Sequence, residues 1–333
     1  FGPVDGANVA DWPISYDDLE PYYTKVETEV GVSGKTQAHK FADQRSTPDY
    51  PYPPTAEHPI TQGIDAACRE LGFTALKTPR AILSRPDMGR RSCEYSGYCG
   101  SYGCSSGAKG SSRAALLDRA IQGGNCRIIA DAKVYALSSD NTGKVTAARY
   151  YDKSGQAQAV TARTFVVACQ AIETSRLLLA STGPRHPHGL GNNHGQVGKN
   201  LVFSAGGSGT GKFIYSKLEK SKADRLKLRG PFVNRGLQDW YIIDDPKFGQ
   251  RMKGGTIDFL LSHPNPIARA LRQKWDDDGW LVWGKELKTQ LHANFTDHQV
   301  LKFEVFNDWL PTDNCFVSLD SKVKDRWGSN AVS

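Results

Sequence analysis

Long apolar runs are missing from this sequence, which limits the classes of protein that it can belong to. No run approaches the roughly 20 consecutive apolar residues that a membrane-spanning helix needs. Blocks of Lys and Arg interleaved with aromatic residues are missing too, so the sequence indicates no nucleic-acid-binding surface. Internal repeats and low-complexity tracts do not occur either. What is left is the composition of an ordinary folded protein.

That composition supports one large domain or two ordinary ones. The chain has 333 residues, of which 39% are hydrophobic and 23% are charged, and this suffices for a sizeable core. The net charge is +7, from 42 basic and 35 acidic residues spread along the chain. A mildly basic surface attracts acidic partner proteins or sugar acids.

The chain begins at Phe1 without a Met or a signal peptide, and it stops at Ser333. We therefore expect it to be an internal piece of a longer polypeptide.

Three helices are predicted in the first 122 residues. Ser15 is a suitable N-cap, Asp17 and Asp18 follow it in the first turn, and Gly31 ends the apolar periodicity. Further helices are predicted over residues 58–71 and 112–122, and a long surface loop over 35–57.

The middle of the chain predicts strands that lead into a helix. Short strands are expected at residues 126–130, 133–137 and 145–151, separated by Asp- and Gly-containing turns. A buried strand is expected at 161–168, followed by a helix over 171–180. A buried strand, a tight turn and a helix N-terminus together form the usual cradle for a phosphate.

Residues 200–310 are rich in aromatic residues and alternate between polar and apolar positions. The alternation predicts an antiparallel sheet with strands at 240–243, 256–261, 290–295 and 300–306, and a helix near 267–275. The glycine run 206–212 mimics a phosphate-binding loop, but Phe213 replaces the Ser or Thr that would hold magnesium. A flexible hairpin is the better interpretation of that run. The fold class is therefore α/β with an antiparallel sheet attached.

Three cysteines, Cys93, Cys99 and Cys104, lie in one glycine-rich stretch. Thiolates are soft ligands for iron–sulfur clusters or zinc, although this spacing matches no common zinc finger. The residues alone leave two interpretations open: a metal centre, or a loop of thiols that only braces a cofactor. The other four cysteines have apolar neighbours and are predicted to be buried free thiols.

Glu304 lies among apolar neighbours in an alternating strand. An inward-facing carboxylate there would have a raised pKa and would serve as a base, whereas an outward-facing one would be solvated. The outward orientation is the better supported of the two.

Four segments together resemble the glucose–methanol–choline (GMC) family of flavin oxidoreductases. They are residues 11–34, 166–179, 197–201 and 311–328, in the family's order. The resemblance implies four parts: a helix and loop segment over 1–90, an FAD-binding portion of Rossmann type over 91–200, an antiparallel substrate domain over 201–310, and a return to the FAD domain over 311–333.

Within that family, residues 99–109 are similar to the flavoprotein subunits of bacterial dehydrogenases that oxidise glucosides, gluconate or glucose. This similarity implies a [3Fe–4S] cluster held by Cys93, Cys99 and Cys104. It also implies FAD contacts from the Val134 backbone, from the turn at Ala168, Cys169 and Gln170, and from Glu173. Gln170 occupies a position at which the family has glycine.

The resemblance implies hydride transfer from a sugar hydroxyl to the flavin, with electrons leaving through the cluster to a cytochrome-type acceptor. The family's catalytic His–Asn pair would lie beyond Ser333. Sugar contacts are expected from Glu304 and Trp309, together with Trp240, Trp283 and Phe306. A small companion subunit and a bacterial periplasmic location are also implied.

Two other interpretations remain open. The protein would be a non-catalytic iron–sulfur or carbohydrate-binding scaffold, or an oxygen-using oxidase of the same family whose cysteines are inert.

Overall fold

The structure is a computed structural model that describes residues 3–42, 44–100, 103–249, 251–262 and 264–333. The described chain divides into two compact units, each built from segments that are distant in sequence. Unit 1 comprises residues 12–126 and 204–308, and unit 2 comprises residues 3–11, 127–203 and 309–333. Over these described ranges, no helix has both the length and the apolar character needed to cross a membrane.

Unit 1 begins with helix α1 (Tyr16–Val30), whose ends are the ones that the sequence predicts. The Ser15 side chain accepts from the Asp18 N–H, and the Ser15 N–H donates to the Asp18 carboxylate, which completes a capping box. Gly31 ends the helix with φ of 85°, a left-handed conformation that glycine adopts without strain.

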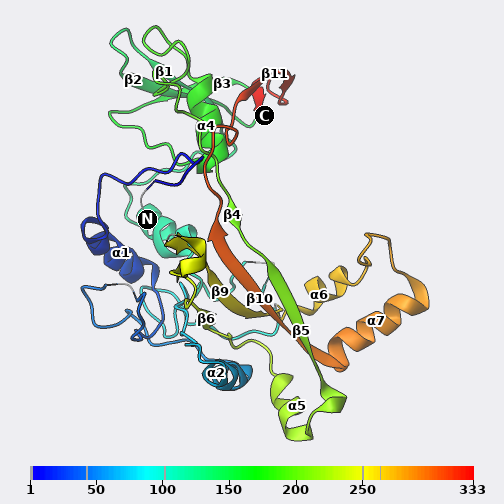
Figure 1. The fold of residues 1–333 in the computed structure, drawn as a ribbon. Helices are drawn as coiled ribbons and strands as arrows, with labels where there is room; N and C mark the ends of the chain where they lie inside the picture. The colour runs from blue at the N-terminus through cyan, green and yellow to red at the C-terminus, as the bar shows by residue number, and fades with distance from the viewer. Residues whose placement is uncertain (1–2, 43, 101–102, 250, 263) are drawn as a thin grey trace. The chain divides into compact units, whose positions relative to one another are not determined.

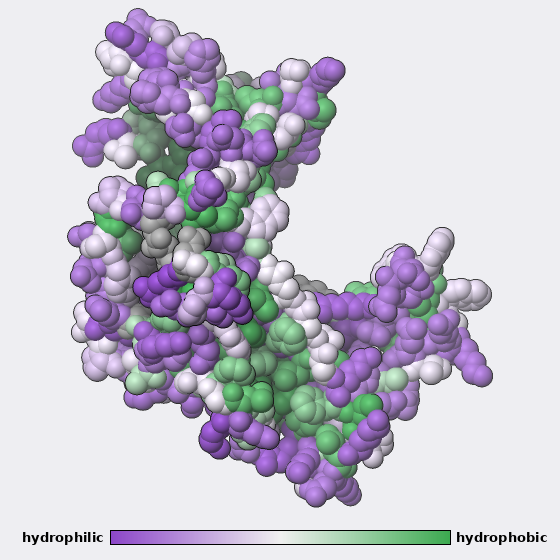
Figure 2. Space-filling view, in the orientation of Figure 1, coloured by the Kyte–Doolittle hydropathy of each residue, from purple (hydrophilic) through white to green (hydrophobic). Residues whose placement is uncertain are grey.

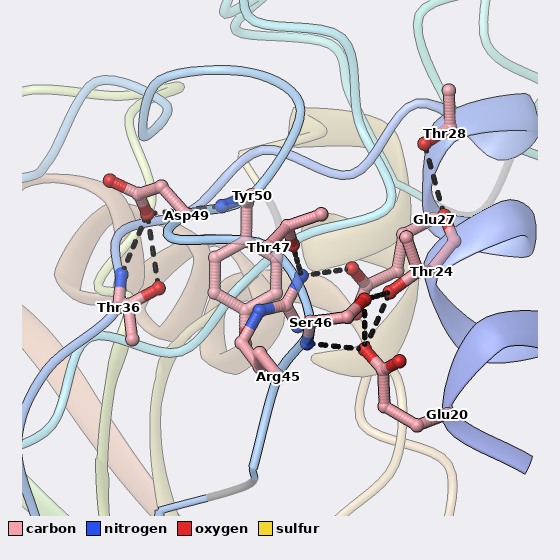
Figure 3. Close-up of polar contacts among 10 residues, drawn as sticks. All are labelled: Glu20, Thr24, Glu27, Thr28, Thr36, Arg45, Ser46, Thr47, Asp49 and Tyr50. Carbon is pink, nitrogen blue, oxygen red and sulfur yellow. Dashed lines mark hydrogen bonds and ion pairs between the residues drawn. The ribbon is translucent and has the colours of Figure 1, made fainter. Parts of the chain in front are cut away.

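The predicted surface loop after α1 is confirmed, and polar contacts hold it against that helix (Figure 3). Glu20 accepts hydrogen bonds from the Ser46 N–H and hydroxyl at 2.8 and 2.9 Å. Arg45 makes a two-pronged ion pair with Glu27 and lies 4.1 Å above the Tyr50 ring. These contacts order a segment that has no regular secondary structure of its own.

The main sheet of unit 1 is antiparallel and five-stranded, as the alternation predicts (Figure 1). Its central strand β10 pairs with β4 and β5 along one side and with β9 on the other, and β9 pairs with β6. The strands are β4 (Ser204–Ala205), β5 (Ser208–Ile214), β6 (Arg235–Leu237), β9 (Thr256–Leu261) and β10 (His298–Asp308).

Helix α2 (Ile60–Glu70) packs on one face of this sheet and forms the core. Ile60, Ile64 and Cys68 are each about 5–6% exposed and cluster with Val233 and Leu237. The neighbouring strands contribute the partly buried apolar side chains Phe213, Ile257, Phe259, Leu261 and Leu301. Burial of such side chains is the main stabilising contribution to the unit.

The remaining elements of unit 1 are short or lie outside the sheet. They are a π-helical turn (Arg113–Leu117), α3 (Asp118–Gln122), a 3-10 turn (Tyr215–Lys217), α5 (Lys220–Leu226), β7 (Ile242–Ile243), a 3-10 turn (Pro246–Phe248), β8 (Met252–Lys253), α6 (Pro266–Arg272) and α7 (Gly284–Thr296). The predicted helices over 58–71 and 112–122 are thereby confirmed, the second with a π-helical first half.

Three predictions for unit 1 are wrong. Residues 240–243 do not join the main sheet, because only Ile242 and Ile243 are extended, as β7, and they pair with β8 in a separate two-stranded sheet. The glycine run 206–212 is not a free hairpin, because most of it forms β5 and pairs with β10. Residues 290–295 are not a strand but the second half of α7. Their alternation is short, and the preceding Lys285, Glu286 and Leu287 are strong helix formers that extend the helix through it.

Unit 2 contains an antiparallel three-stranded meander, β1 (Lys133–Ser139), β2 (Val145–Tyr151) and β3 (Ala157–Thr161), followed by α4 (Gln170–Ala180). The hairpin β11 (Leu319–Lys324) and β12 (Asn330–Val332) completes it, and Arg176 of α4 donates to the Asn330 carbonyl at 2.8 Å. The predicted strands at 133–137 and 145–151 and the predicted helix are confirmed.

The strands predicted at 126–130 and 161–168 are wrong. A tight turn at Asp152–Gly155 starts β3 earlier than predicted, so the paired strand ends at Thr161. An apolar run becomes a strand only where a neighbour hydrogen-bonds to it, and none of the described residues pairs with 162–168. Val166 is 87% exposed there, so this run is not buried.

Candidate functional site

The cysteine stretch belongs to unit 1, and one buried arginine holds its two ends together. The Arg90 side chain donates to the carbonyls of Gly107, Ala108 and Val30 at 2.8 to 2.9 Å. Arg90 is only 8% exposed, and this burial lowers the pKa of its guanidinium. Because a guanidinium presents several donors in one plane, a single side chain joins the end of α1 to both sides of the loop.

Asn265 fixes the middle of the stretch. Its side-chain amide donates to the Tyr98 carbonyl at 2.9 Å, and its backbone N–H donates to the Cys99 carbonyl at 3.1 Å. Its side-chain oxygen accepts from the Ala268 N–H at 3.0 Å and so caps α6. Asn265 is 1% exposed, so one buried residue connects α6 to the backbone beside Cys99.

Tyr95 determines how the chain turns between Cys93 and Cys99. Its φ is 49°, its hydroxyl accepts from the Ala56 N–H at 2.8 Å, and its ring lies 6.1 Å from the ring of Phe232. Its carbonyl oxygen lies so close to Gly230 that a Cβ there would be only 2.0 Å away. Glycine at position 230 is therefore needed for the close approach of the two segments.

The environments of Cys93 and Cys104 differ. Burial raises the pKa of the Cys93 thiol, and the nearby Cys99 and Cys104 raise it further. Burial also acts to raise the pKa of Cys104, but hydrogen bonds outweigh it and leave that pKa lowered. Those bonds come from the Ser106 hydroxyl at 3.4 Å and the Lys109 N–H at 3.5 Å. The structure therefore brings the three thiols within electrostatic range, and hydrogen bonds lower the pKa of one of them, Cys104.

A polar cavity of about 580 Å³ opens beside Cys104, lined by the cations Arg90, Lys109 and Arg113 and by Asp118. Across the described part of the chain, however, no three His, Cys, Asp or Glu side chains converge as metal ligands. The arrangement gathers the thiols on one loop without forming a ligand set. All seven cysteines are free. Of the four that the sequence predicts to be buried, only Cys68 is buried, whereas Cys126 and Cys315 are half-buried and Cys169 is exposed.

Unit 2 holds the predicted cofactor residues. A cavity of about 310 Å³ lies between β1 and α4, and Val134, Cys169 and Glu173 line it. Glu173 contacts Lys133 and Arg176, each at 3.4 Å, so charged groups of both signs border this cavity. Ala168 and Gln170 flank Cys169 in sequence at the helix entrance.

Gln170 has φ of 67°, the left-handed conformation in which glycine is favoured. Its side chain accepts from the Ile172 N–H at 3.0 Å, and the Cys169 N–H donates to Thr174 at 3.1 Å. Gln170 therefore adopts a backbone conformation that favours glycine, which lowers the free energy of unfolding by about 1–2 kcal/mol.

Glu304 is half-buried on β10, forms an ion pair with Lys302, and lies opposite Asp258 of β9 in register. Burial raises the pKa of Asp258, Glu304 raises it further, and Arg80 opposes the effect. Sequence reasoning missed Asp258, although a lone carboxylate within the apolar run 256–261 is a signal for a buried charge.

The predicted aromatic sugar contacts have different surroundings. Trp240 packs against Phe73 with 4.6 Å between rings, and Phe306 is 42% exposed. Trp283 is 77% exposed at the start of α7. Trp309 belongs to unit 2, where its ring lies 5.6 Å from that of Phe203.

Comparison with known proteins finds a family match for part of the chain. The family model described as GMC oxidoreductase matches residues 53–204, a range that contains the cysteine stretch, Val134 and α4. The chain is 33% identical over 234 residues to the 6'''-hydroxyparomomycin C oxidase of Streptomyces lividus, covering 70% of this chain and 41% of that protein.

Two dehydrogenases are similar as well. The fructose dehydrogenase large subunit of Gluconobacter japonicus is 34% identical over 206 residues, covering 59% of this chain and 36% of that protein. The 2-methyl-1,2-propanediol dehydrogenase of Mycolicibacterium austroafricanum is 27% identical over 326 residues, covering 97% of this chain and 55% of that protein.

The chain thus spans roughly a third to just over half the length of these relatives. The match over residues 53–204 agrees with the resemblance drawn from the sequence, and the helices with antiparallel sheets agree with the expected mixed α/β class. Residues 53–204 of the chain therefore match the GMC oxidoreductase family.

Proposed function

We propose that the intact protein is an FAD-dependent dehydrogenase that oxidises a hydroxyl group of a sugar or glycoside. The observation that carries the proposal is the GMC oxidoreductase match over residues 53–204, a range that includes all but one of the residues lining the cavity between β1 and α4. The substrate class follows from relatives that are named for fructose and for an aminoglycoside.

The residues of unit 2 fit the adenosine end of FAD. The 310 Å³ cavity has the size of a small-ligand site and presents the start of β1 beside the start of α4. Val134 would meet the adenine through its backbone, and Cys169 and Glu173 would border the ribose. When bound, the flavin accepts the hydride. The chain's own part is to position it: Arg176 joins α4 to Asp325 at 2.6 Å and holds that wall of the cavity in place.

We assign Cys93, Cys99 and Cys104 as the candidate ligands of an iron–sulfur cluster. The support is their shared loop, the lowered pKa of Cys104 and the N–H donor to its sulfur, which resembles the hydrogen bonding of cluster thiolates. Among the described residues, their side chains do not converge as metal ligands. A cytochrome-type acceptor, a small companion subunit and a periplasmic location belong to the same proposal.

A second candidate is an oxygen-using oxidase of the same family. It is supported by the relative named as an oxidase and by the absence of a converged ligand set among the described cysteines.

One experiment separates these candidates. The intact gene product, purified without oxygen, is assayed with a dye acceptor and with dioxygen against aldoses, aldonates and glucosides, alongside flavin, iron and sulfide analysis. The dehydrogenase predicts flavin bleaching by a sugar, dye reduction much faster than oxygen uptake, and iron that is lost in Cys104→Ser but kept in the matched Cys68→Ser. Rapid oxygen uptake without iron would support the oxidase, and protein without flavin would overturn both.

A further inference from the structure

A second cavity of unit 1 is apolar and lies away from the cysteine stretch. It has a volume of about 670 Å³ and lies between α2, α5 and the sheet, lined among others by Ile60, Ile64, Phe213, Leu226, Phe259 and Leu301. Figure 2 shows apolar residues gathered between α2 and α5. A cavity of this size and lining is typical of a small-molecule site.

The polar groups of this cavity are few and cationic. Its charged lining residues are Lys222 and Arg225 of α5, and no Asp or Glu is among the described residues that line it. Arg225 donates to the neutral Gln62 of α2 at 2.9 Å. Lys222 is 69% exposed and has a long contact of 3.8 Å with Glu219, so its charge is at the solvent end of the cavity.

Two hydrogen bonds join the segment of α2 to the segment of α5 beside the cavity. The Arg225–Gln62 bond joins α5 to α2 on one side. On another side, His58, which precedes α2, bonds through its ring to the Leu228 carbonyl that follows α5, at 3.1 Å. His58 is fully buried, so this second contact is shielded from water.

We propose that this cavity binds a free single-chain carboxylate of the fatty-acid class. The apolar tail lies in the cavity bounded by α2, α5 and the sheet, where it removes apolar surface from water. The carboxylate lies between Lys222 and Arg225, which provide charge-assisted hydrogen bonds. The cationic end and the lack of lining carboxylates select an anion over a cationic or neutral amphiphile.

Gly63 offers a way to close the cavity. It lies in α2 and lines the cavity, and a Cβ built on it has no other heavy atom within 4 Å. A large side chain there would enter the cavity, whereas alanine would add one methyl group in open space and favour the helix. Gly63→Phe and Gly63→Ala therefore form a matched pair.

The test measures binding of dodecanoate to the full chain by titration calorimetry, below the critical micelle concentration. Dodecanol and dodecyltrimethylammonium are the head-group comparisons, and octanoate to tetradecanoate are the chain-length series. We expect affinity to rise about fourfold for each added methylene. We also expect at least tenfold weaker binding of both comparison amphiphiles, loss of binding in Gly63→Phe, and retention in Gly63→Ala.

A double variant, Lys222→Gln with Arg225→Gln, changes only α5 side chains. It provides an independent test if Gly63→Phe does not fold. It should weaken dodecanoate at least tenfold and leave dodecanol unchanged. The proposal is overturned if the trimethylammonium compound binds as tightly as dodecanoate or if the double variant binds normally. It is also overturned if only vesicles of phosphatidylglycerol bind, which would indicate a membrane surface. None of these outcomes depends on flavin or on dehydrogenase activity.

Discussion

The cysteine stretch of unit 1 and the cavity of unit 2 are held in different ways. The cavity lies between a regular strand, β1, and a regular helix, α4, whose backbone groups largely satisfy each other. The cysteine stretch has little regular structure, and its carbonyls are satisfied by side chains from elsewhere in unit 1, Arg90 and Asn265.

This difference determines how sensitive each site is to a single substitution. Hydrogen bonds in ladders and helices are numerous and local, so loss of one side chain changes little. An irregular loop depends on a few long-range donors, and removal of one takes a hydrogen bond from several carbonyls at once. Single substitutions should therefore disturb unit 1 more than unit 2.

The largest effect is expected from Arg90→Ala. It removes the donors to the carbonyls of Val30, Gly107 and Ala108 and should lower the free energy of unfolding by about 4 kcal/mol. Urea unfolding followed by fluorescence measures this loss, and the half-buried Cys93 thiol should react faster with a thiol reagent. Arg90→Lys is the control, because it keeps the charge but not the planar set of donors. Equal stability of Arg90→Ala and the unsubstituted protein would contradict this account of the loop.

Gly230→Ala should have the next largest effect. The new Cβ would lie 2.0 Å from the Tyr95 carbonyl oxygen, at φ of 102°, and we expect a loss of about 3 kcal/mol. Gly72→Ala is the matched control, since its φ is 77° but a Cβ there meets no atom within 4 Å. That control should lose only about 1 kcal/mol. Thermal unfolding of the two variants separates the effect of the steric clash from that of the backbone strain. Equal losses of stability would show that the clash contributes nothing.

A smaller effect is expected from pH through His58, another side chain that holds irregular parts of unit 1. Burial lowers the pKa of His58 below its ordinary value of 6.5, with a further lowering from Arg229 and an opposing bond to Leu228. Its Nδ1 accepts from the Ile60 N–H at 3.1 Å, so protonation of that nitrogen would break the contact.

The unfolded chain therefore binds a proton near pH 6.5 that the folded chain excludes. The contribution of His58 to stability is complete above that pH and declines below it, by about 1 kcal/mol at pH 5.5. Urea unfolding at pH 7.5 and 5.5 should show this decline, and His58→Gln should reduce it. Replacement of the exposed His188 by Gln should leave the decline as it was. A decline of the same size in His58→Gln would assign it to other groups.

The smallest effect is expected in unit 2, from Gln170→Gly. Glycine adopts φ of 67° without strain but costs more entropy on folding, so a net gain of about 0.5 kcal/mol is expected. Gln170→Ala keeps the strain and loses the bond to Ile172, and it should be slightly destabilising. Calorimetric unfolding of both variants checks the sign, and a loss of stability in Gln170→Gly would show that the glutamine side chain matters more than the backbone shape.

The sequence predicts those parts of the fold that depend on local signals. Ser15 and Gly31 mark the ends of α1 because caps act within one turn, and the alternation of residues 300–306 marks β10. The run 161–168 has the composition of a buried strand, but a strand also needs a paired neighbour, which lies outside any local window. The predicted strand at 290–295, which is part of α7, is wrong for a related reason. An alternation of six residues is too short to distinguish the period of a strand from that of a helix.

The candidate sites show the same limit. The residue types at Cys93, Cys99 and Cys104 are visible in the sequence, and the structure places their thiols within range of each other. The residues that hold them are not visible, because Arg90 and Asn265 act on carbonyls up to 167 positions away in the sequence. Val134, Cys169 and Glu173 are easier to find, since adjacent regular elements bring them together.

Asn265 also connects α6 directly to the cysteine stretch. The same residue starts that helix and bonds to the peptide groups of Tyr98 and Cys99, without an intervening flexible joint. Any contact that tilts α6 is therefore transmitted directly to the backbone beside a thiol. Ile267 and Leu271 of α6 are more than half exposed. A contact at this surface of α6 would therefore affect the cysteine stretch, although the sequence of α6 gives no indication of the connection.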